Sequence, residues 1–157
     1  MICEKACKFY SSNFNLNIGI LRLFSTFGPD LKRQVIYDTI KKIKTLKKFK
    51  IIGDGNEIRN FCYINDQVKS IMQLSKKVKR PKGEIYNIAS GRKFAIKQIL
   101  KKLIKISNKK VNYIFTNKRR SFDTKNFIAN KSKLFKTIGK HSLTPMEVAL
   151  RKTYQSY

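Results

Sequence analysis

Apolar residues recur at helical spacing in several parts of the chain. The cleanest stretch, residues 95–107, has one stripe of five apolar residues at intervals of one helical turn: Ile96, Ile99, Leu100, Leu103 and Ile104. The same periodicity predicts three further helices, over residues 1–14, 33–46 and 66–77. A short helix is expected before Gly139, and Thr144-Pro145-Met146-Glu147 has the form of a capping box that starts a last helix.

Apolar stretches of strand length lie between these helices. They cover residues 17–24, 49–52, 60–64, 84–89 and 111–115. Because strands and helices alternate along the chain, we expect an α/β fold. The first of these stretches is typical of a strand buried on both faces, which needs sheet neighbours on both sides. The chain contains few strands that could be such neighbours, so its sequence is typical of the second half of a larger fold.

Length and composition fit one domain, or part of a larger one. The chain has 157 residues, and a hydrophobic content of 41% is enough for a packed core. The stretch Ile18 to Phe24 is far too short to cross a bilayer, and the first residues lack a secretion-signal pattern, so we expect a cytoplasmic protein. Cys3, Cys7 and Cys62 lack the spacing of metal ligands, which indicates reduced structural thiols and no metal site.

The charge is strongly positive, with 36 Lys and Arg against 9 Asp and Glu and a net charge of +27. A polyanion partner such as nucleic acid is one explanation. A general lysine bias is the other, because 28 of the 36 basic residues are lysines, spread along the whole chain. Nucleic-acid readers usually add arginine clusters and exposed aromatic residues. The pattern therefore favours the lysine bias and leaves small phosphate-bearing ligands compatible with both explanations.

The segment from Gly53 to Asp66 carries the most chemical information. Gly53-Asp54-Gly55 supplies the backbone freedom of a tight turn. Arg59 follows where such a turn can aim its guanidinium at an anion. A short strand is expected next, and Asn65 or Asp66 can cap the helix after it.

Four segments, in this order, resemble those of extended short-chain dehydrogenase/reductases that act on nucleotide sugars. Residues 21–29 resemble the family's LRxFNxYGP, residues 53–66 its GDGxxxRDFxYVDD, and residues 84–91 its GExYNIGSG. Residues 120–123 with 130–133 resemble the closing RPGD and DxSK motifs. Together the four segments cover nearly the whole chain.

The resemblance implies the C-terminal part of a Rossmann-type doubly wound sheet together with a small α/β substrate-binding domain. Residues 1–30 would hold the last helix and strand of a truncated Rossmann domain, and residues 31–157 the substrate-binding region, with 84–91 returning to the Rossmann sheet. The family binds NAD through a glycine-rich loop. Its Tyr-x-x-x-Lys pair takes a proton from the sugar hydroxyl as hydride moves to NAD. We find neither motif at its family position in this sequence.

Two features of the sequence concern the Tyr-x-x-x-Lys pair that is missing from its family position. Glu4 fits, by its spacing to Arg22, a glutamate that often stands four residues after the family's lysine, which places that lysine just before Met1. Tyr37 and Lys41 form a Tyr-x-x-x-Lys, but they lie downstream of the LRxF segment, and roughly 0.9 such matches are expected by chance. We therefore interpret Tyr37 as an ordinary helix residue and assign no catalytic residue. His141, the single histidine, receives no role either.

The family motifs imply a set of binding residues. Arg59 corresponds to an arginine that clamps the diphosphate, for which a bidentate guanidinium is well suited. Ser25 stands where the family has a sugar-nucleotide asparagine, and Asn60 replaces an aspartate. The remaining substrate positions are a second phosphate arginine, a carboxylate near the ribose and two base-pocket residues: Arg120, Asp123, Lys50 and Ile52. The residues beside the nicotinamide are Leu23 and Phe24.

These observations predict the nucleotide-sugar-binding part of an NAD-dependent epimerase or dehydratase. The resemblance is greatest to UDP-hexose 4-epimerases, a family of isomerases that is often homodimeric. The ligand would be a UDP-sugar, the chain alone would be inactive, and a separate chain could supply the Rossmann half. The alternatives are a basic nucleic-acid-binding protein and a non-functional remnant, which would expose a strand edge.

Overall fold

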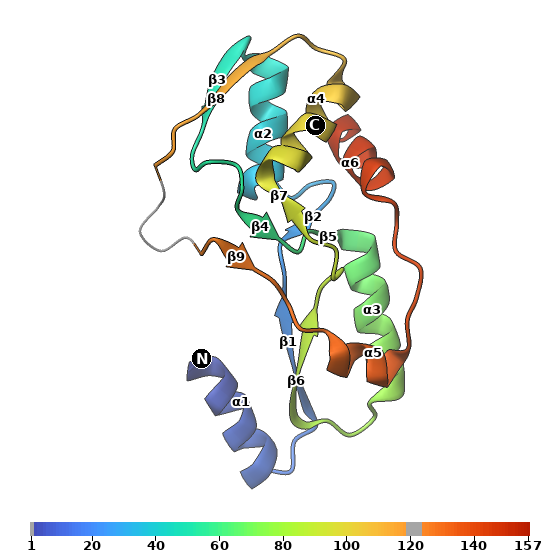
Figure 1. The fold of residues 1–157 in the computed structure, drawn as a ribbon. Helices are drawn as coiled ribbons and strands as arrows, with labels where there is room; N and C mark the ends of the chain where they lie inside the picture. The colour runs from blue at the N-terminus through green and yellow to red at the C-terminus, as the bar shows by residue number, and fades with distance from the viewer. Residues whose placement is uncertain (1, 119–123) are drawn as a thin grey trace.

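The computed structural model describes residues 2–118 and 124–157, which form an α/β fold (Figure 1). The helices are α1 (Ile2–Asn13), α2 (Gln34–Thr45), α3 (Ile64–Lys77), α4 (Ile96–Ser107), α5 (Ser132–Ile138) and α6 (Met146–Gln155). The strands are β1 (Ile18–Leu23), β2 (Thr26–Phe27), β3 (Lys48–Ile51), β4 (Ile58–Arg59), β5 (Cys62–Tyr63), β6 (Lys82–Ile88), β7 (Phe94–Ala95), β8 (Asn112–Phe115) and β9 (Asn126–Phe127).

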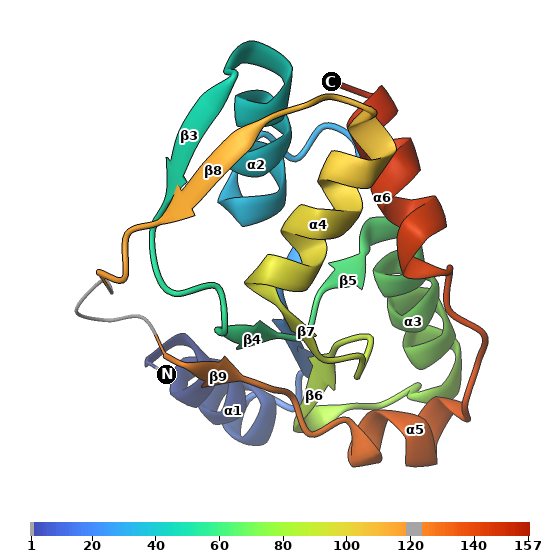
Figure 2. The same ribbon diagram turned by 45° about the horizontal axis from the view of Figure 1, so that its top comes forward.

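The main core lies in the part of the molecule that contains β3 and β8. These strands are parallel, with Phe49 opposite Tyr113. The helices α2 and α4 lie beside them, and α6 packs against α4 on the side away from the strands (Figure 2). The apolar stripe of α4 faces this core, where Leu103 is fully buried. Burial of such stripes supplies most of the stability of short helices, which are marginal alone.

The second part of the molecule contains β1 and β6, which are also parallel, with Leu21 opposite Tyr86. The helices α3 and α5 pack against β6, and α1 packs beside both strands (Figure 1). Its core is small and consists of four buried residues: Leu74, Tyr86, Ile88 and Leu134. Short pairings join the two parts, since β2 is parallel to β5 and β4 lies between β7 and β9.

Most expected elements are present within one to three residues of their predicted ends, and the α/β fold is confirmed. The expected strand over residues 60–64 is shorter than predicted, since β5 covers only Cys62–Tyr63, because the chain changes partner there. Buried Asn60 donates to the carbonyl oxygen of Arg92 at 2.9 Å and accepts from the amide of Ala129. The backbone therefore leaves β4 at Asn60 and joins β2 only at Cys62.

The two predicted helix caps are also wrong, and for one reason. Asp66 lies in the first turn of α3, and its carboxylate accepts from the Thr144 amide at 3.0 Å and from the Thr144 hydroxyl at 2.8 Å. The two polar side chains thus satisfy each other and hold the connection before α6 against α3. Within residues 2–118 and 124–157, we find no helix with the length and apolar character needed to cross a membrane.

Burial on both faces of β1 was also expected, and the structure contradicts it. Gly19 and residues 21–23 are exposed, and Leu23 is 55% exposed. Among the described residues β1 has one hydrogen-bonded neighbour, β6. The sequence of β1 is typical of a buried strand, but other described parts of the chain do not cover its apolar residues.

Candidate functional site

A cleft of about 500 Å³ opens between the N-terminal half of α2, the end of β3, and the segment from Glu57 to Phe61. Its size is in the range of small-molecule sites. The first residue of α4 and the loop after β1 complete its wall. The lining residues are Ser25, Gln34, Val35, Asp38, Thr39, Lys42, Ile51, Ile52, Glu57, Arg59, Phe61 and Ile96.

The turn at one wall of the cleft has the glycine conformations that the sequence requires. Gly53 and Gly55 have φ values of +100° and +77°. Between them, the Asp54 carboxylate accepts from the Asn56 amide at 2.8 Å. The carbonyl oxygen of Gly55 accepts from the amide of Lys97 at 2.9 Å, which ties the turn to the first turn of α4.

Arg59 lies at the margin of this cleft with an oriented guanidinium. Its Nη1 donates to its neighbour Ile58's carbonyl oxygen at 2.9 Å and to that of Lys125 at 3.3 Å. The residue is half-buried, and its backbone is held between β7 and β9. A guanidinium restrained in this way loses little side-chain entropy when it meets an anion, and its planar shape suits phosphate oxygens.

Glu57 was not singled out in the sequence, yet it lines the same cleft. It is 5% exposed, and its Oε1 accepts from the Asp54 amide at 3.1 Å. Its Oε2 has no hydrogen-bond partner among the residues that the structure describes. A buried carboxylate oxygen without a partner is costly, so this atom is suited to a donor brought by a ligand or by water. The polar face of α2, with Gln34, Asp38 and Lys42, was likewise missed.

The structure brings together three of the predicted substrate residues. Ser25, Ile52 and Arg59 line the cleft, whereas Lys50 is exposed outside it and its carbonyl oxygen accepts from Lys42 Nζ at 2.8 Å. The predicted positions Arg120 and Asp123 lie outside the described residues.

The predicted nicotinamide-side residues lie at the end of β1. Leu23 is exposed, and Phe24 is buried against the ring of Phe127 at a centroid distance of 4.8 Å. Neither of them lines the cleft.

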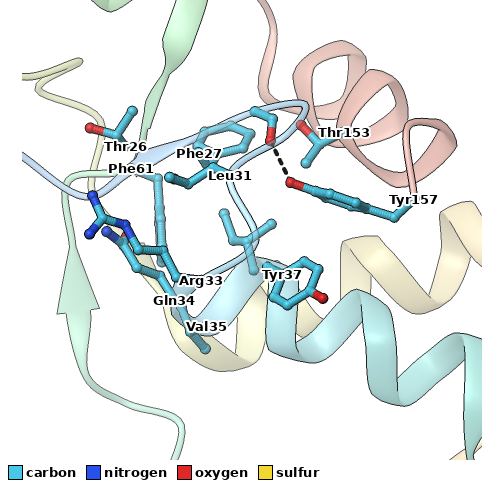
Figure 3. Close-up of a pocket in the computed structure, with 12 residues that line it drawn as sticks. Thr26, Phe27, Leu31, Arg33, Gln34, Val35, Tyr37, Phe61, Thr153 and Tyr157 are labelled. Carbon is cyan, nitrogen blue, oxygen red and sulfur yellow. Dashed lines mark hydrogen bonds between the residues drawn. The ribbon is translucent and has the colours of Figure 1, made fainter.

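A second cavity, beside the start of α2, is closed by the C-terminal residue (Figure 3). The Tyr157 hydroxyl donates to the carbonyl oxygen of Gly28 at 3.0 Å, and burial raises the pKa of Tyr157. Its volume of about 10 Å³ holds no more than about one water molecule. Tyr37 packs edge-on against Tyr157 here, with ring centroids 5.0 Å apart, so its contacts are those of an ordinary packing residue.

Known proteins resemble this chain in sequence and in fold. Residues 1–89 match the model of the NAD dependent epimerase/dehydratase family. The chain is 32% identical over 116 residues to YtcB of Bacillus subtilis, an uncharacterised UDP-glucose epimerase, covering 73% of this chain and 36% of the relative. It is 31% identical over 147 residues to the UDP-glucuronate 4-epimerase of Thermodesulfobacterium geofontis, covering 92% of this chain and 44% of that one. It thus spans less than half the length of these relatives.

Solved structures show the same likeness. UDP-glucuronic acid 4-epimerase from Bacillus cereus, in complex with UDP-glucuronic acid and NAD, superposes with a TM-score of 0.88 and 28% identity. The match covers 98% of this chain and 49% of that enzyme. UDP-N-acetylglucosamine 4-epimerase from Methanobrevibacter ruminantium, with 25% identity and a TM-score of 0.84, covers 99% of this chain and 50% of its own. The chain therefore belongs to the NAD-dependent epimerase/dehydratase family.

Proposed function

We propose that the cleft binds a nucleotide sugar, with a UDP-sugar as its ligand, as the substrate-binding part of a UDP-hexose 4-epimerase. The observation that carries this proposal is the guanidinium of Arg59, oriented at the cleft margin by two backbone carbonyl groups. It is supported by the UDP-sugars named in the complexes of the two solved neighbours.

Each predicted residue would contact a different part of the ligand. Arg59 would clamp the diphosphate with Arg120, and Asp123 would lie near the ribose. Ile52 would lie against the base, with Lys50 at the outer margin of the base pocket. Ser25, which lines the cleft beside Arg59, can both donate and accept a hydrogen bond to the sugar nucleotide.

We further infer a domain division and a role that is limited to binding. We place residues 1–30 and 84–91 in a Rossmann-type sheet, in line with the parallel pairing of β1 and β6, and the remainder of 31–157 in the substrate region. NAD would supply hydride transfer from the rest of that fold, where Leu23 and Phe24 would line the nicotinamide side. We infer that the chain alone is inactive. The three free cysteines fit a cytoplasmic protein.

Isothermal titration calorimetry with UDP and UDP-glucuronic acid tests the binding proposal. Arg59→Ala should weaken UDP binding by about tenfold or more, and Arg59→Lys should recover only part of it because the fork is lost. Arg151→Ala is the matched control, since it removes the same charge from the exposed face of α6. Equal affinity in the Arg59→Ala and Arg151→Ala proteins would refute the diphosphate clamp.

Two further measurements separate the alternatives. UDP-sugar turnover by the purified chain, abolished by Arg59→Ala, would contradict the expected inactivity. Tight RNA binding with a steep salt dependence, together with no UDP binding, would instead favour the nucleic-acid alternative.

A further inference from the structure

The cleft that we propose as an anion site also contains a buried acidic side chain. Glu57 lines this cleft and is 5% exposed. Its Oε1 accepts from the Asp54 amide at 3.1 Å, while its Oε2 has no hydrogen-bond partner among the residues that the structure describes. A buried carboxylate oxygen without a partner destabilises the folded chain. The Oε2 atom therefore indicates a hydrogen-bond donor that comes from outside the described residues.

The turn before Glu57 fixes the place of this carboxylate. A Cβ added to Gly53 would collide with Oε1 and lie 3.1 Å from Oε2, so the carboxylate fills the space that a side chain at residue 53 would need. It lies directly beside the residue that follows Ile52, which also lines the cleft and is 52% exposed. The last torsion angle of a glutamate is soft, so Oε2 can turn toward the cleft at little cost.

The charge of Glu57 restricts the part of a ligand that it can contact. A carboxylate repels phosphate oxygens, so Glu57 and Arg59 are suited to different parts of one ligand. An ionised carboxylate only accepts hydrogen bonds, so the group opposite Oε2 has to carry an N–H or O–H. Beside Ile52, the proposed base residue, a ring N–H of the base meets this requirement. Uracil, thymine and guanine carry such an N–H, whereas adenine and cytosine do not.

We propose that Glu57 is a specificity-determining residue of the cleft, whose Oε2 accepts a hydrogen bond from the ring N–H of the nucleotide base. The ligand class is a nucleoside diphosphate sugar whose base carries this N–H, and UDP-sugars belong to it. This role depends on the proposed function, because it requires a nucleotide in the cleft. Glu57 lies outside the set of residues that the family motifs imply.

Isothermal titration calorimetry with two matched ligands tests this role. UDP carries the N3–H of uracil, and 3-methyl-UDP has a methyl group in place of that hydrogen. Glu57→Gln keeps the size of the side chain and an acceptor for the Asp54 amide, but removes the charge. It should weaken UDP binding by about tenfold or more, because hydrogen bonds to charged groups are the stronger ones. Binding of 3-methyl-UDP, which lacks the donor, should hardly change.

Glu147→Gln is the matched control. It removes the same charge from an exposed ion pair with Lys102, outside the cleft, and should leave both affinities unchanged. If Glu57→Gln weakens UDP and 3-methyl-UDP equally, Glu57 only supports the turn, and the proposal is overturned. Unchanged UDP binding would overturn it as well, because water would then be the donor to Oε2.

A third ligand distinguishes the base from the ribose. With 2′-deoxy-UDP the loss caused by Glu57→Gln should persist, and its disappearance would assign the contact to the ribose hydroxyl and overturn the base contact. The outcomes also separate the two proposals. UDP that does not bind the unaltered chain refutes the proposed function and this role together. UDP binding that depends on Arg59 but not on Glu57 refutes only this role.

Discussion

Gly55→Ala should destabilise the chain through one specific contact. Gly55 has a φ of +77°, and a Cβ built on it would lie 2.5, 2.7 and 3.0 Å from three atoms of the Phe115 ring. Side-chain carbons do not tolerate such separations, so either the ring or the turn must move. Phe115 packs against the main core, and the Gly55 carbonyl oxygen is bonded to α4, so neither can move freely.

The magnitude follows from two contributions. Holding a non-glycine residue at positive φ costs about 1–3 kcal/mol. Forcing an extra methyl group into a packed site costs about 1–3 kcal/mol more. We therefore expect the free energy of unfolding of the Gly55→Ala protein to fall by about 2–6 kcal/mol.

Gly139→Ala carries only the first contribution. Gly139 has a φ of +79°, and a Cβ added there meets no atom within 4 Å. Its ψ of 169° lies in a region nearly restricted to glycine. The backbone cost of alanine at position 139 should therefore be at least as large as that at position 55. The expected loss is about 1–3 kcal/mol, so the difference between the two variants measures the Phe115 contact.

Urea unfolding followed by circular dichroism measures both variants. Phe115→Leu, combined with Gly55→Ala, should recover part of the extra loss, because the shorter side chain leaves room for the methyl group. If Gly55→Ala costs no more than Gly139→Ala, or if Phe115→Leu does not interact with it, the contact does not shape this turn.

Three other measurements test further parts of the structure. Leu103 is fully buried in the main core, so Leu103→Ala should lower the free energy of unfolding by about 2–5 kcal/mol in urea titrations. Burial raises the pKa of Cys62 to about 12, so iodoacetamide at about pH 8 should label exposed Cys3 in the folded chain and Cys62 only after unfolding. Burial lowers the pKa of His141, so the unfolded chain binds more protons; stability should fall as pH drops below about 6.5, and His141→Gln should flatten that slope.

The fold could be predicted largely because its signals are local. The stripe of α4 and the glycines at 53 and 55 depend on near neighbours in the sequence, and both have the predicted conformations. The caps at Asp66 and Thr144 could not be predicted in the same way. Each residue is a good cap by its local pattern, but the contact between them joins positions 78 residues apart. The local preference of a residue for capping is overridden where a distant residue forms hydrogen bonds with the same side chain.

The same difference between local and tertiary signals applies to the site. Arg59 was predicted because a glycine turn and a strand fix its position within a few residues. Glu57, two positions away, was missed because an acidic residue in a turn is usually solvated, and only tertiary packing shows that it is buried in the cleft. One signal was present in the sequence: an acidic residue in a chain of net charge +27, within the segment that carries Arg59.

The cleft and the strand β1 depend on different parts of the fold. The cleft is built on the main core, since Ile51, Phe61 and Ile96 belong both to its lining and to that core. The open edge of β1 is supported by the smaller core of four residues. Local stability follows buried apolar contact, so β1 should exchange its amide hydrogens faster than β3 in the isolated chain. The cleft can therefore be formed in the isolated chain, where β1 is expected to be the less protected strand.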